Sequence, residues 1–292
     1  MSRWNRLVGT PLAPFTGPFP YRPFLEICAA KSTGEVRVVT DGSGAIALVL
    51  AGDTVRLAGD RHLTDYHSPL GAETRNLVAT MIAELDGMRF ELDSLPQEAA
   101  GPLAASFEAE GRSPILEADE SCRVLQLDGA DPENWESLLR SKDRHEVRRK
   151  RRRYEEVRGV PEVAAGLEHF DAFVALHRSA IGDKGDFMTD RMEAFFCDLL
   201  RLPTARLDVL VGDSEVVAAA LGFEDDDGYY LYNSAYDSSL ADLSPGIILI
   251  DSLIARTVLR GRTRFDFLKG TESYKRRLGA IERPLYRLEV AT

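Results

Sequence analysis

Residues 242–275, DLSPGIILIDSLIARTVLRGRTRFDFLKGTESYK, predict the helix and strand around which the chain is organised. Ser244-Pro245-Gly246 is typical of a helix start, because serine caps free N–H groups and proline in the first turn loses no hydrogen bond. Apolar residues then recur at helical spacing, at Ile247, Ile250, Leu253, Ile254 and Val258. Arg260-Gly261 ends the helix, since a cation suits the last turn and glycine tolerates positive φ.

A strand is expected on either side of this helix. Residues 228–234, GYYLYNS, are rich in aromatic residues and predict the first strand, and residues 264–268, RFDFL, predict the second. The helix start then lies at the end of a strand, where free N–H groups and the helix dipole attract phosphate or pyrophosphate. A plain structural crossover explains the same pattern equally well.

Composition indicates a globular protein of one large domain or two smaller ones. The 292 residues are 44% hydrophobic and 28% charged. A net charge of −11 argues against nucleic acid as a general partner. Three scattered cysteines without metal-ligand spacing suggest buried, reduced thiols in a cytoplasmic protein. The proline-rich N-terminus has the pattern of neither a signal peptide nor a membrane span, and we expect an irregular arm over the first domain.

The two halves of the chain show the same order of elements, which predicts a duplicated α/β unit. Gly71 and Phe90 are 19 positions apart, as are Gly246 and Phe265, and each glycine follows a polar loop. In the first half we predict strands at 35–40, 45–51, 54–58, 88–92, 114–117 and 122–127, with helices at 73–84 and 97–110. In the second half we predict helices at 170–181, 190–200 and 272–278, and strands at 206–211, 216–223, 229–235 and 285–290.

This order predicts two domains of mixed α/β fold, residues 1–130 and 161–292, joined by a basic linker helix over 131–160. The first domain lacks a counterpart of Tyr274-Lys275, so we expect a degenerate copy followed by an active one. The linker carries six consecutive cations, Arg148, Arg149, Lys150, Arg151, Arg152 and Arg153. They suit a phosphorylated substrate or RNA, but glutamates in the same segment make a solvated helix the better explanation.

Several common catalytic motifs are absent from the sequence. No metal-binding spacing of His, Cys or carboxylates occurs, and neither a P-loop nor a GxGxxG motif is present. Asp225-Asp226-Asp227-Gly228 is better explained as a hairpin turn than as a calcium loop.

The remaining candidate chemistry follows the central helix. Asp266 and Glu272 offer carboxylates, Tyr274 a phenol and Lys275 an amine, all within ten positions. Asp266 alternates with two phenylalanines, so it faces away from them and can serve as a general base or bind an acceptor. A salt bridge from Asp266 to Arg264 or Lys275 is an equally good structural explanation.

These residues resemble a known family. The run Asp266-Phe267-Leu268-Lys269-Gly270 with Tyr274-Lys275, behind the Ser-Pro-Gly helix start, is similar to the CelD/BcsL-type acetyltransferases of the GNAT superfamily. That group is often linked to cellulose or exopolysaccharide biosynthesis. The resemblance implies tandem GNAT-like domains, as in Fem-type aminoacyl transferases. The usual GNAT pyrophosphate loop has a Gln or Arg and spaced small residues, and here only Gly246 remains.

The resemblance also implies an acyl-CoA co-substrate, acetyl-CoA or another, and no metal. The strand containing Tyr232, Asn233 and Ser234 would pair with pantetheine, and the amides of Gly246, Ile247 and Ile248, behind Ser244, would hold the pyrophosphate. An acceptor amine or hydroxyl would attack the thioester directly. Asp266 or Glu272 would accept the proton, Tyr274 would protonate the thiolate, and Lys275 would neutralise phosphate or hold the acceptor.

Two other functions fit the sequence. A Fem-type transferase would use aminoacyl-tRNA, with residues 148–153 as the RNA contact. A non-catalytic protein would bind a nucleotide-linked sugar. The acceptor and the oligomeric state stay open, because fold analogy supplies neither.

Overall fold

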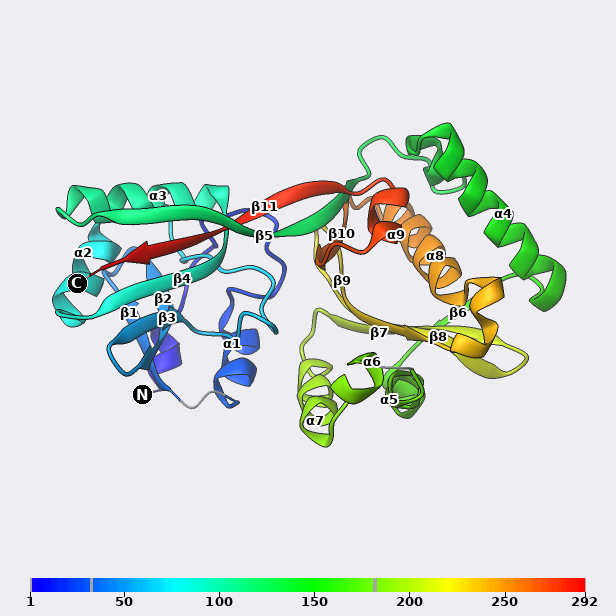
Figure 1. Cartoon of the computed structure of the whole chain (residues 1–292), viewed down its shortest axis with the longest axis horizontal. Coiled ribbons are helices and arrows are strands. Elements are labelled where there is room, and N and C mark those ends of the chain that lie inside the picture. The colour runs from blue at the N-terminus through cyan, green and yellow to red at the C-terminus, as the bar shows by residue number, and fades with distance from the viewer. Residues whose placement is uncertain (1, 32–33, 181–182, 292) are drawn as a thin grey trace. The chain divides into compact units, whose positions relative to one another are not determined.

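The computed structural model describes residues 2–31, 34–180 and 183–291 (Figure 1). The chain forms two compact units. Unit 1 comprises Met1–Cys122 and Glu282–Thr292, and unit 2 comprises Arg123–Ile281. Each unit has a mixed α/β fold, as the alternation of strand and helix patterns predicts.

Unit 1 is a mixed sheet covered by helices. Its strands, in spatial order, are β1 (Glu35–Thr40), β2 (Ala45–Ala51), β3 (Thr54–Leu57), β4 (Arg89–Pro96), β11 (Ile281–Val290) and β5 (Pro114–Gln126). β3 and β4 are parallel and are connected through α2 (Arg75–Glu84), while β4 is followed directly by α3 (Gln97–Ala109). The core lies between helices and sheet, where Met81, Leu103 and Phe107 pack on Leu48 and Phe90.

The N-terminal segment is more ordered than expected. It contains a 3-10 helix, η1 (Arg3–Arg6), and leads into an α-helix, α1 (Arg22–Ala29), whereas the expected arm was irregular. Proline stands in the first turn of α1, and Phe24, Leu25 and Cys28 bury one face of it. The helix forms because this burial outweighs the proline-rich composition that suggested a loop.

The helix predicted at 73–84 begins two residues later than expected, and Pro69-Leu70-Gly71 does not open it. Leu70 forms isolated bridges with Pro11 and Ala45, and α2 begins only at Arg75. Gly71 has a φ of +114°, and a Cβ there would lie 2.8 Å from the Ser43 carbonyl oxygen. Gly71 therefore allows two backbone segments to approach closely, and does not begin a helix.

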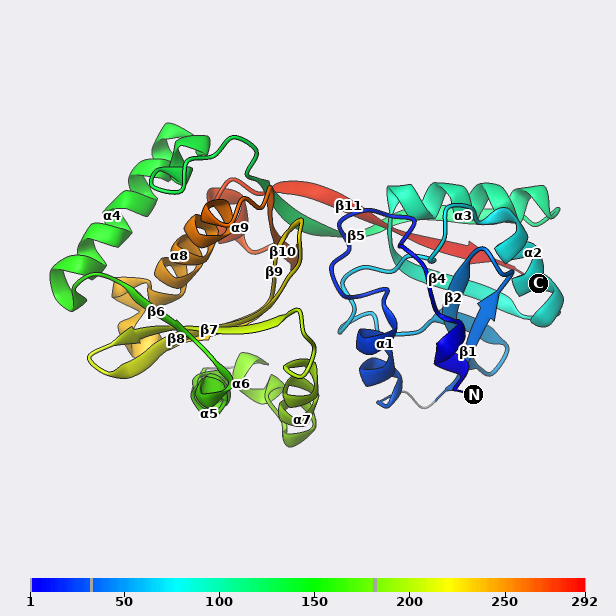
Figure 2. The same ribbon diagram turned by 180° about the vertical axis from the view of Figure 1, so that it is seen from behind.

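Unit 2 has helices on both faces of its sheet (Figures 1 and 2). The strands, in spatial order from β5, are β10 (Arg264–Lys269), β9 (Gly228–Tyr236), β8 (Glu215–Glu224), β7 (Ala205–Gly212) and β6 (Glu162–Ala165). β9 and β10 are parallel and the pairs from β6 to β9 are antiparallel. One face carries α5 (Phe170–Arg178), α6 (Asp183–Phe187) and α7 (Asp190–Leu199), and the other carries α8 (Pro245–Leu259) and α4 (Ser141–Arg158).

Helix α8 is the centre of the unit 2 core. Leu253 and Ile254 are completely buried and pack with Phe265 and Phe267 of β10. Within this apolar cluster Trp135 donates its indole N–H to Asp251 of α8 at 2.9 Å. The predicted apolar stripe and the strand that follows it are thus confirmed.

The segment before α4 is interrupted, which the sequence did not indicate. A 3-10 helix, η2 (Trp135–Leu138), precedes α4, with extended backbone at Leu139 between them. Trp135, Leu139 and Tyr154 are buried in the unit 2 core, so this segment folds onto the unit and is not a free linker.

Other differences are local. The strands predicted at 114–117 and 122–127 form the single strand β5, and β11 begins at Ile281 and pairs antiparallel with β4 of unit 1. β6 and α6 lack a clear sequence signal, and the predicted end of the helix at Ile181 lies outside the described residues. Cys28 and Cys122 are buried as expected, but Cys197 is exposed.

Candidate functional site

The start of α8 is held by a contact from α4. Ser244 has left-handed backbone (φ 54°) and its side chain makes no capping hydrogen bond, contrary to expectation. Its hydroxyl instead accepts a hydrogen bond from Nζ of Lys150 at 2.8 Å. Lys150 of the basic run therefore lies at the N-terminus of α8, where the helix dipole is also positive. A bound anion would offset both the ammonium and the positive end of the dipole.

The amides proposed to bind pyrophosphate are only partly available. Ile247 and Ile248 donate to the Ser244 carbonyl at 2.9 and 3.1 Å, and Pro245 has no N–H. The Gly246 amide takes no part in these two hydrogen bonds to the Ser244 carbonyl. A Cβ on Gly246 would lie 3.2 Å from the Tyr236 ring, so glycine also brings the end of β9 close to the helix start.

Lys150 has an unusual environment for a surface helix. Burial lowers its pKa below the ordinary value, and Arg149 and Arg277 lower it further, while Glu146 opposes the shift. Neighbouring cations of the same sign destabilise each other, and a bound phosphate would relieve this repulsion. The sequence marked the whole basic run, but only the fold distinguishes Lys150 from the other five cations.

Part of the basic run is neutralised within unit 2. Arg151 donates to Asp251 with two bonds at 2.7 and 2.8 Å. Arg148 donates to the buried Glu136 at 3.0 Å. These pairs attach α4 to α8 and η2, so they have a structural role that the predicted RNA contact did not include.

An open pocket of about 670 Å³ lies along α4. Its lining mixes both signs of charge, from Glu133, Asn134, Glu136, His145, Arg148, Arg151, Arg152 and Glu155. Because acids and bases alternate there, the pocket has no clear preference for one sign of ligand.

Strands β9 and β10 separate beside the start of α8. Their register contains three pairs and ends at Asp266 opposite Tyr230, although β9 continues to Tyr236. A bulge follows on the other edge of β9, because Leu221 pairs with Asn233 and Gly222 with Leu231, which leaves Tyr232 without a partner residue in β8. Bulges bend strands and are frequent next to active sites.

The residues predicted to accompany a pantetheine chain lie on this part of β9. Tyr232 contacts the ring of Phe223, with centroids 5.4 Å apart, and Asn233 and Ser234 are partly buried. No residue of β10 pairs with these positions. The β9 backbone here can therefore accept an extended ligand as an additional strand.

Asp266 is completely buried in β10. Its carboxylate accepts a hydrogen bond from the amide of Leu268 at 2.8 Å, and Leu268 has a φ of 57°. A left-handed leucine inside a strand is strained and is typical of functional sites. Asp266 faces the side of β10 opposite Phe265 and Phe267, as alternation along the strand predicted.

Glu272 and Lys275 hold the turn after β10. Lys275 is buried, pairs with Glu272 at 3.1 Å, and donates to the carbonyl of Lys269 at 2.5 Å. The turn passes through Gly270, where a Cβ would lie 2.3 Å from a carboxylate oxygen of Glu272. Lys275 thus pairs with Glu272 and not with Asp266.

Tyr274 lies in the short helix α9 (Ser273–Arg277) and contacts Phe267 edge-on, with centroids 6.1 Å apart. Burial, with the charge of Glu272, raises the pKa of its phenol. The phenol therefore stays protonated at neutral pH and can donate a proton. Because Phe267 alternates with Asp266, the structure places Tyr274 and Asp266 on opposite sides of β10.

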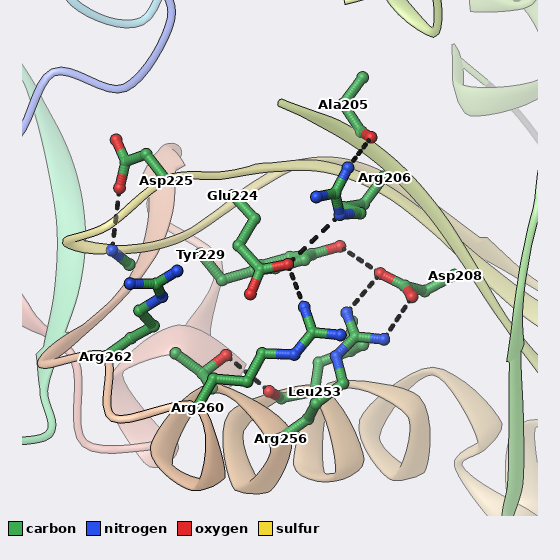
Figure 3. Close-up of polar contacts among 12 residues, drawn as sticks. Ala205, Arg206, Asp208, Glu224, Asp225, Tyr229, Leu253, Arg256, Arg260 and Arg262 are labelled. Carbon is green, nitrogen blue, oxygen red and sulfur yellow. Dashed lines mark hydrogen bonds and ion pairs between the residues drawn. The ribbon is translucent and has the colours of Figure 1, made fainter. Parts of the chain in front are cut away.

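The other end of α8 is fixed by a buried charge cluster (Figure 3). Arg256 donates two hydrogen bonds to Asp208, which is completely buried and also accepts from the Tyr229 hydroxyl at 2.9 Å. Glu224 accepts from Arg206 and Arg260. Sequence reasoning missed this cluster, although a lone Asp208 in an apolar strand pattern was a possible signal.

Two negative findings apply to the described part of the chain. No group of three or more His, Cys, Asp or Glu is arranged to hold a metal ion. The helices there are all too short or too polar to cross a membrane. The hairpin expected at Asp225 is confirmed, since its carboxylate accepts from the amides of Asp227 and Gly228.

Several solved structures share this fold. A conserved protein of unknown function from Bacteroides thetaiotaomicron is 11% identical, with a TM-score of 0.71 over 99% of this chain and 96% of its own. FemX is 10% identical, with a TM-score of 0.63 over 92% and 91%. L-PGS from Bacillus licheniformis is 15% identical, with a TM-score of 0.60 over 97% of this chain and 93% of its own. At such identities the likeness concerns the fold alone.

The sequence itself matches one family model. No curated protein shows significant sequence similarity to the chain. Residues 141–276 match the family described as "Acetyltransferase (GNAT) domain", and this range contains α4, the bulged strand β9, the start of α8 and β10. The similarity to GNAT acetyltransferase domains therefore concerns residues 141–276, which are a little under half of the chain.

Proposed function

We propose that the protein is an acyl-CoA-dependent N- or O-acyltransferase, with acetyl-CoA as the principal donor. The observation that carries this proposal is the separation of β9 from β10 directly beside the start of α8. An extended pantetheine chain would pair with the free edge of β9 at Asn233 and Ser234. The pyrophosphate would then lie at Gly246, between the α8 dipole and the ammonium of Lys150.

The reaction requires only direct attack. The acceptor nitrogen or oxygen forms a bond with the acyl carbon, the C–S bond breaks, and a backbone N–H of β9 polarises the carbonyl oxygen. Asp266 would accept the proton of the acceptor and return it to the departing thiolate, because the protonated phenol of Tyr274 lies on the other side of β10. Glu272 and Lys275 would act mainly by fixing the turn that carries Tyr274.

A binding measurement tests the donor and its site. We expect saturating acetyl-CoA to raise the melting temperature, because a ligand at 100 times its Kd stabilises by about 2.7 kcal/mol. Gly246→Glu should abolish the shift, since the carboxylate would occupy the phosphate position. Lys150→Met should weaken acetyl-CoA binding about 10- to 100-fold, the usual effect of removing one charge-assisted hydrogen bond.

Lys142→Met is the matched control, because Lys142 is exposed in the same helix. Equal losses in the two lysine variants would indicate a diffuse charge effect and would contradict the assigned phosphate site. No stabilisation of the wild type by acetyl-CoA, CoA or longer acyl-CoA would overturn the donor assignment.

As a second part of the proposal, the acceptor is a sugar-linked or cell-envelope molecule. It rests on the resemblance to CelD/BcsL-type enzymes of cellulose and exopolysaccharide biosynthesis, and the domain match is consistent with it. Acetylation of an amino sugar or a polysaccharide precursor by the purified protein would support it. Activity confined to free amino acids would count against it.

A transferase that uses aminoacyl-tRNA is the second candidate. It is favoured by the fold shared with FemX and with L-PGS, and by Arg152 and Arg153, which are exposed on α4. Binding of tRNA that weakens steeply with salt, and is lost in the double variant Arg152→Gln, Arg153→Gln, would support this function. Acetyl-CoA stabilisation without tRNA binding would decide for the acyl-CoA donor.

A further inference from the structure

The open pocket along α4 takes no part in the acyl transfer proposed above. It has a volume of about 670 Å³ and is lined by η2, by the two residues before η2 and by one side of α4. On α4 the lining includes His145, Arg148, Arg152 and Glu155, whose spacing of three or four positions places them on one helix face. Lys150 precedes Arg152 by two positions and so points roughly 160° away from it around the helix. The pocket is therefore separate from the proposed donor site.

Glu136 gives this pocket a buried acceptor atom that lacks a donor. The Glu136 side chain is 3% exposed, and Arg148 donates to its Oε1 at 3.0 Å. Arg151 lies 3.7 Å from the same oxygen. The other oxygen, Oε2, is buried and makes no hydrogen bond with any described residue. A carboxylate oxygen that is shielded from water without a donor costs stability, and a donor from a ligand would remove that cost.

Asp251 shows the contrast. It is buried like Glu136 and lies against the same arginine, Arg151. Its Oδ1 accepts from Trp135 and from Arg151, and its Oδ2 accepts from Arg151. Both oxygens of Asp251 are therefore satisfied within unit 2. The unsatisfied oxygen belongs to Glu136, the one of these two acids that borders the pocket.

Two guanidinium groups of the pocket lining have N–H donors to spare. Arg148 uses Nε for Glu136 and Nη2 for Asn134, so its Nη1 takes part in neither bond. Arg152 is exposed and forms no hydrogen bond or ion pair with any described residue. The two arginines are four positions apart on one helix face, so they can bind a single carboxylate between them.

The unsatisfied acceptor and the spare donors lie close together. Oε2 belongs to the carboxylate that Arg148 contacts at 3.0 Å, so it adjoins a guanidinium. An anionic ligand would pair with the arginines but would place a second negative charge beside Glu136. A cationic ligand would satisfy Glu136 but would leave Arg152 unpaired. A zwitterion offers both charges, and an α-amino acid carries them on a single carbon.

We propose that the pocket along α4 binds a free α-amino acid as its zwitterion. The ammonium donates to Oε2 of Glu136, and the carboxylate accepts from Arg148 and Arg152. The side chain of the amino acid extends into the open part of the pocket. This inference does not depend on the acyl-CoA function, since none of these groups belongs to the proposed donor site. The bound amino acid should also raise the melting temperature, because a ligand that binds only the folded state stabilises it.

Isothermal titration calorimetry of the wild type tests the ligand class. Each common protein amino acid is titrated alone, and each one that binds is compared with its N-acetyl and methyl ester derivatives. We expect saturable binding of at least one amino acid with a Kd of about 1 mM or below, as a few charge-assisted hydrogen bonds provide. The N-acetyl derivative lacks the ammonium and the ester lacks the carboxylate, so each should bind at least about 10-fold more weakly.

Two variants test the residues. Arg152→Gln should weaken binding about 10- to 100-fold and keep the melting temperature of the unliganded protein, because Arg152 forms no hydrogen bond or ion pair. Arg153→Gln is the matched control, since Arg153 is exposed on the same helix but does not line the pocket, and it should bind like the wild type. Glu136→Gln should reduce the preference for the free amino acid over its N-acetyl derivative. If loss of the Glu136 ion pair prevents folding, Arg152→Gln decides alone.

Three results would overturn the inference. One is the absence of saturable binding for every common amino acid. Another is equally tight binding of the N-acetyl derivative or the ester, which would reject the zwitterion. The third is an equal loss in Arg152→Gln and Arg153→Gln, which would indicate a diffuse charge effect. The acetyl-CoA shift is measured separately, and its absence would affect the donor proposal but not this one.

Discussion

The β3–α2–β4 crossover of unit 1 and the β9–α8–β10 crossover of unit 2 have the same topology. They differ in how far the first strand continues beyond its last pair with the second. Both join parallel strands through three register pairs and contain one left-handed residue near the end of the second strand, Ser94 and Leu268. β3 ends at Leu57, however, whereas β9 continues past its last β10 pair to Tyr236. Only unit 2 therefore presents a bent strand edge for a ligand.

The two helix starts differ in the same sense. At the start of α2, Thr74 is buried, donates to the Pro102 carbonyl at 3.0 Å and shares a 2.7 Å hydrogen bond with Ser106. At the start of α8, Ser244 is partly exposed and contacts Lys150. A helix start that is buried and hydrogen-bonded, as at Thr74, contributes to stability. A helix start that is partly exposed beside a cation, as at Ser244, is open to an anion.

The largest expected effect concerns the buried ion pair of unit 2. Arg256→Met should destabilise the protein by about 3–5 kcal/mol, because it leaves the completely buried Asp208 without its cation. Arg56→Met in unit 1 removes an exposed pair with Glu91 and should cost at most about 1 kcal/mol. Urea unfolding of both variants measures the difference, and similar losses would show that burial does not distinguish the two units.

A smaller effect is expected at the helix starts. Thr74→Val should cost about 1–2 kcal/mol, because it removes a buried hydroxyl that bonds to two partners. Ser244→Ala should cost less than about 1 kcal/mol, since Lys150 keeps access to water. If the Ser244 variant proves the less stable one in thermal unfolding, the open description of the α8 start is incorrect.

The smallest effect is a pH dependence at Glu224. Burial alone would raise its pKa, but Arg260, Arg256 and Arg206 hold it below the ordinary value of 4.5. As pH falls, Glu224 therefore takes up a proton in the unfolded state before it does so in the folded state. The stability that its ion pairs contribute is complete above about pH 5 and is lost as pH falls below 4.5. Arg260→Gln should lose stability at pH 7, and this loss should diminish as pH falls below 4.5, as measured by urea unfolding. A gap between them that is constant with pH would contradict the assignment.

The sequence predicted most strands and helices because hydrophobic periodicity and turn residues are local signals. The stripe from Ile247 to Val258 and the strand at Phe265 follow directly from spacing, and both form as expected. The break before α4 and the helix α1 were not predictable in this way. The break before α4 depends on burial of Trp135 in the unit 2 core, and α1 on the complete burial of Phe24.

The candidate site shows the same division. Residue types along 242–275 predicted that a helix start, an acid within a strand and a phenol would follow one another, since these are properties of order along the chain. Only the tertiary structure placed Lys150 on Ser244 and ended the β9–β10 register at Tyr230. Such contacts depend on strand register and helix packing, which are fixed by long-range burial, and the residues they join need share no local pattern.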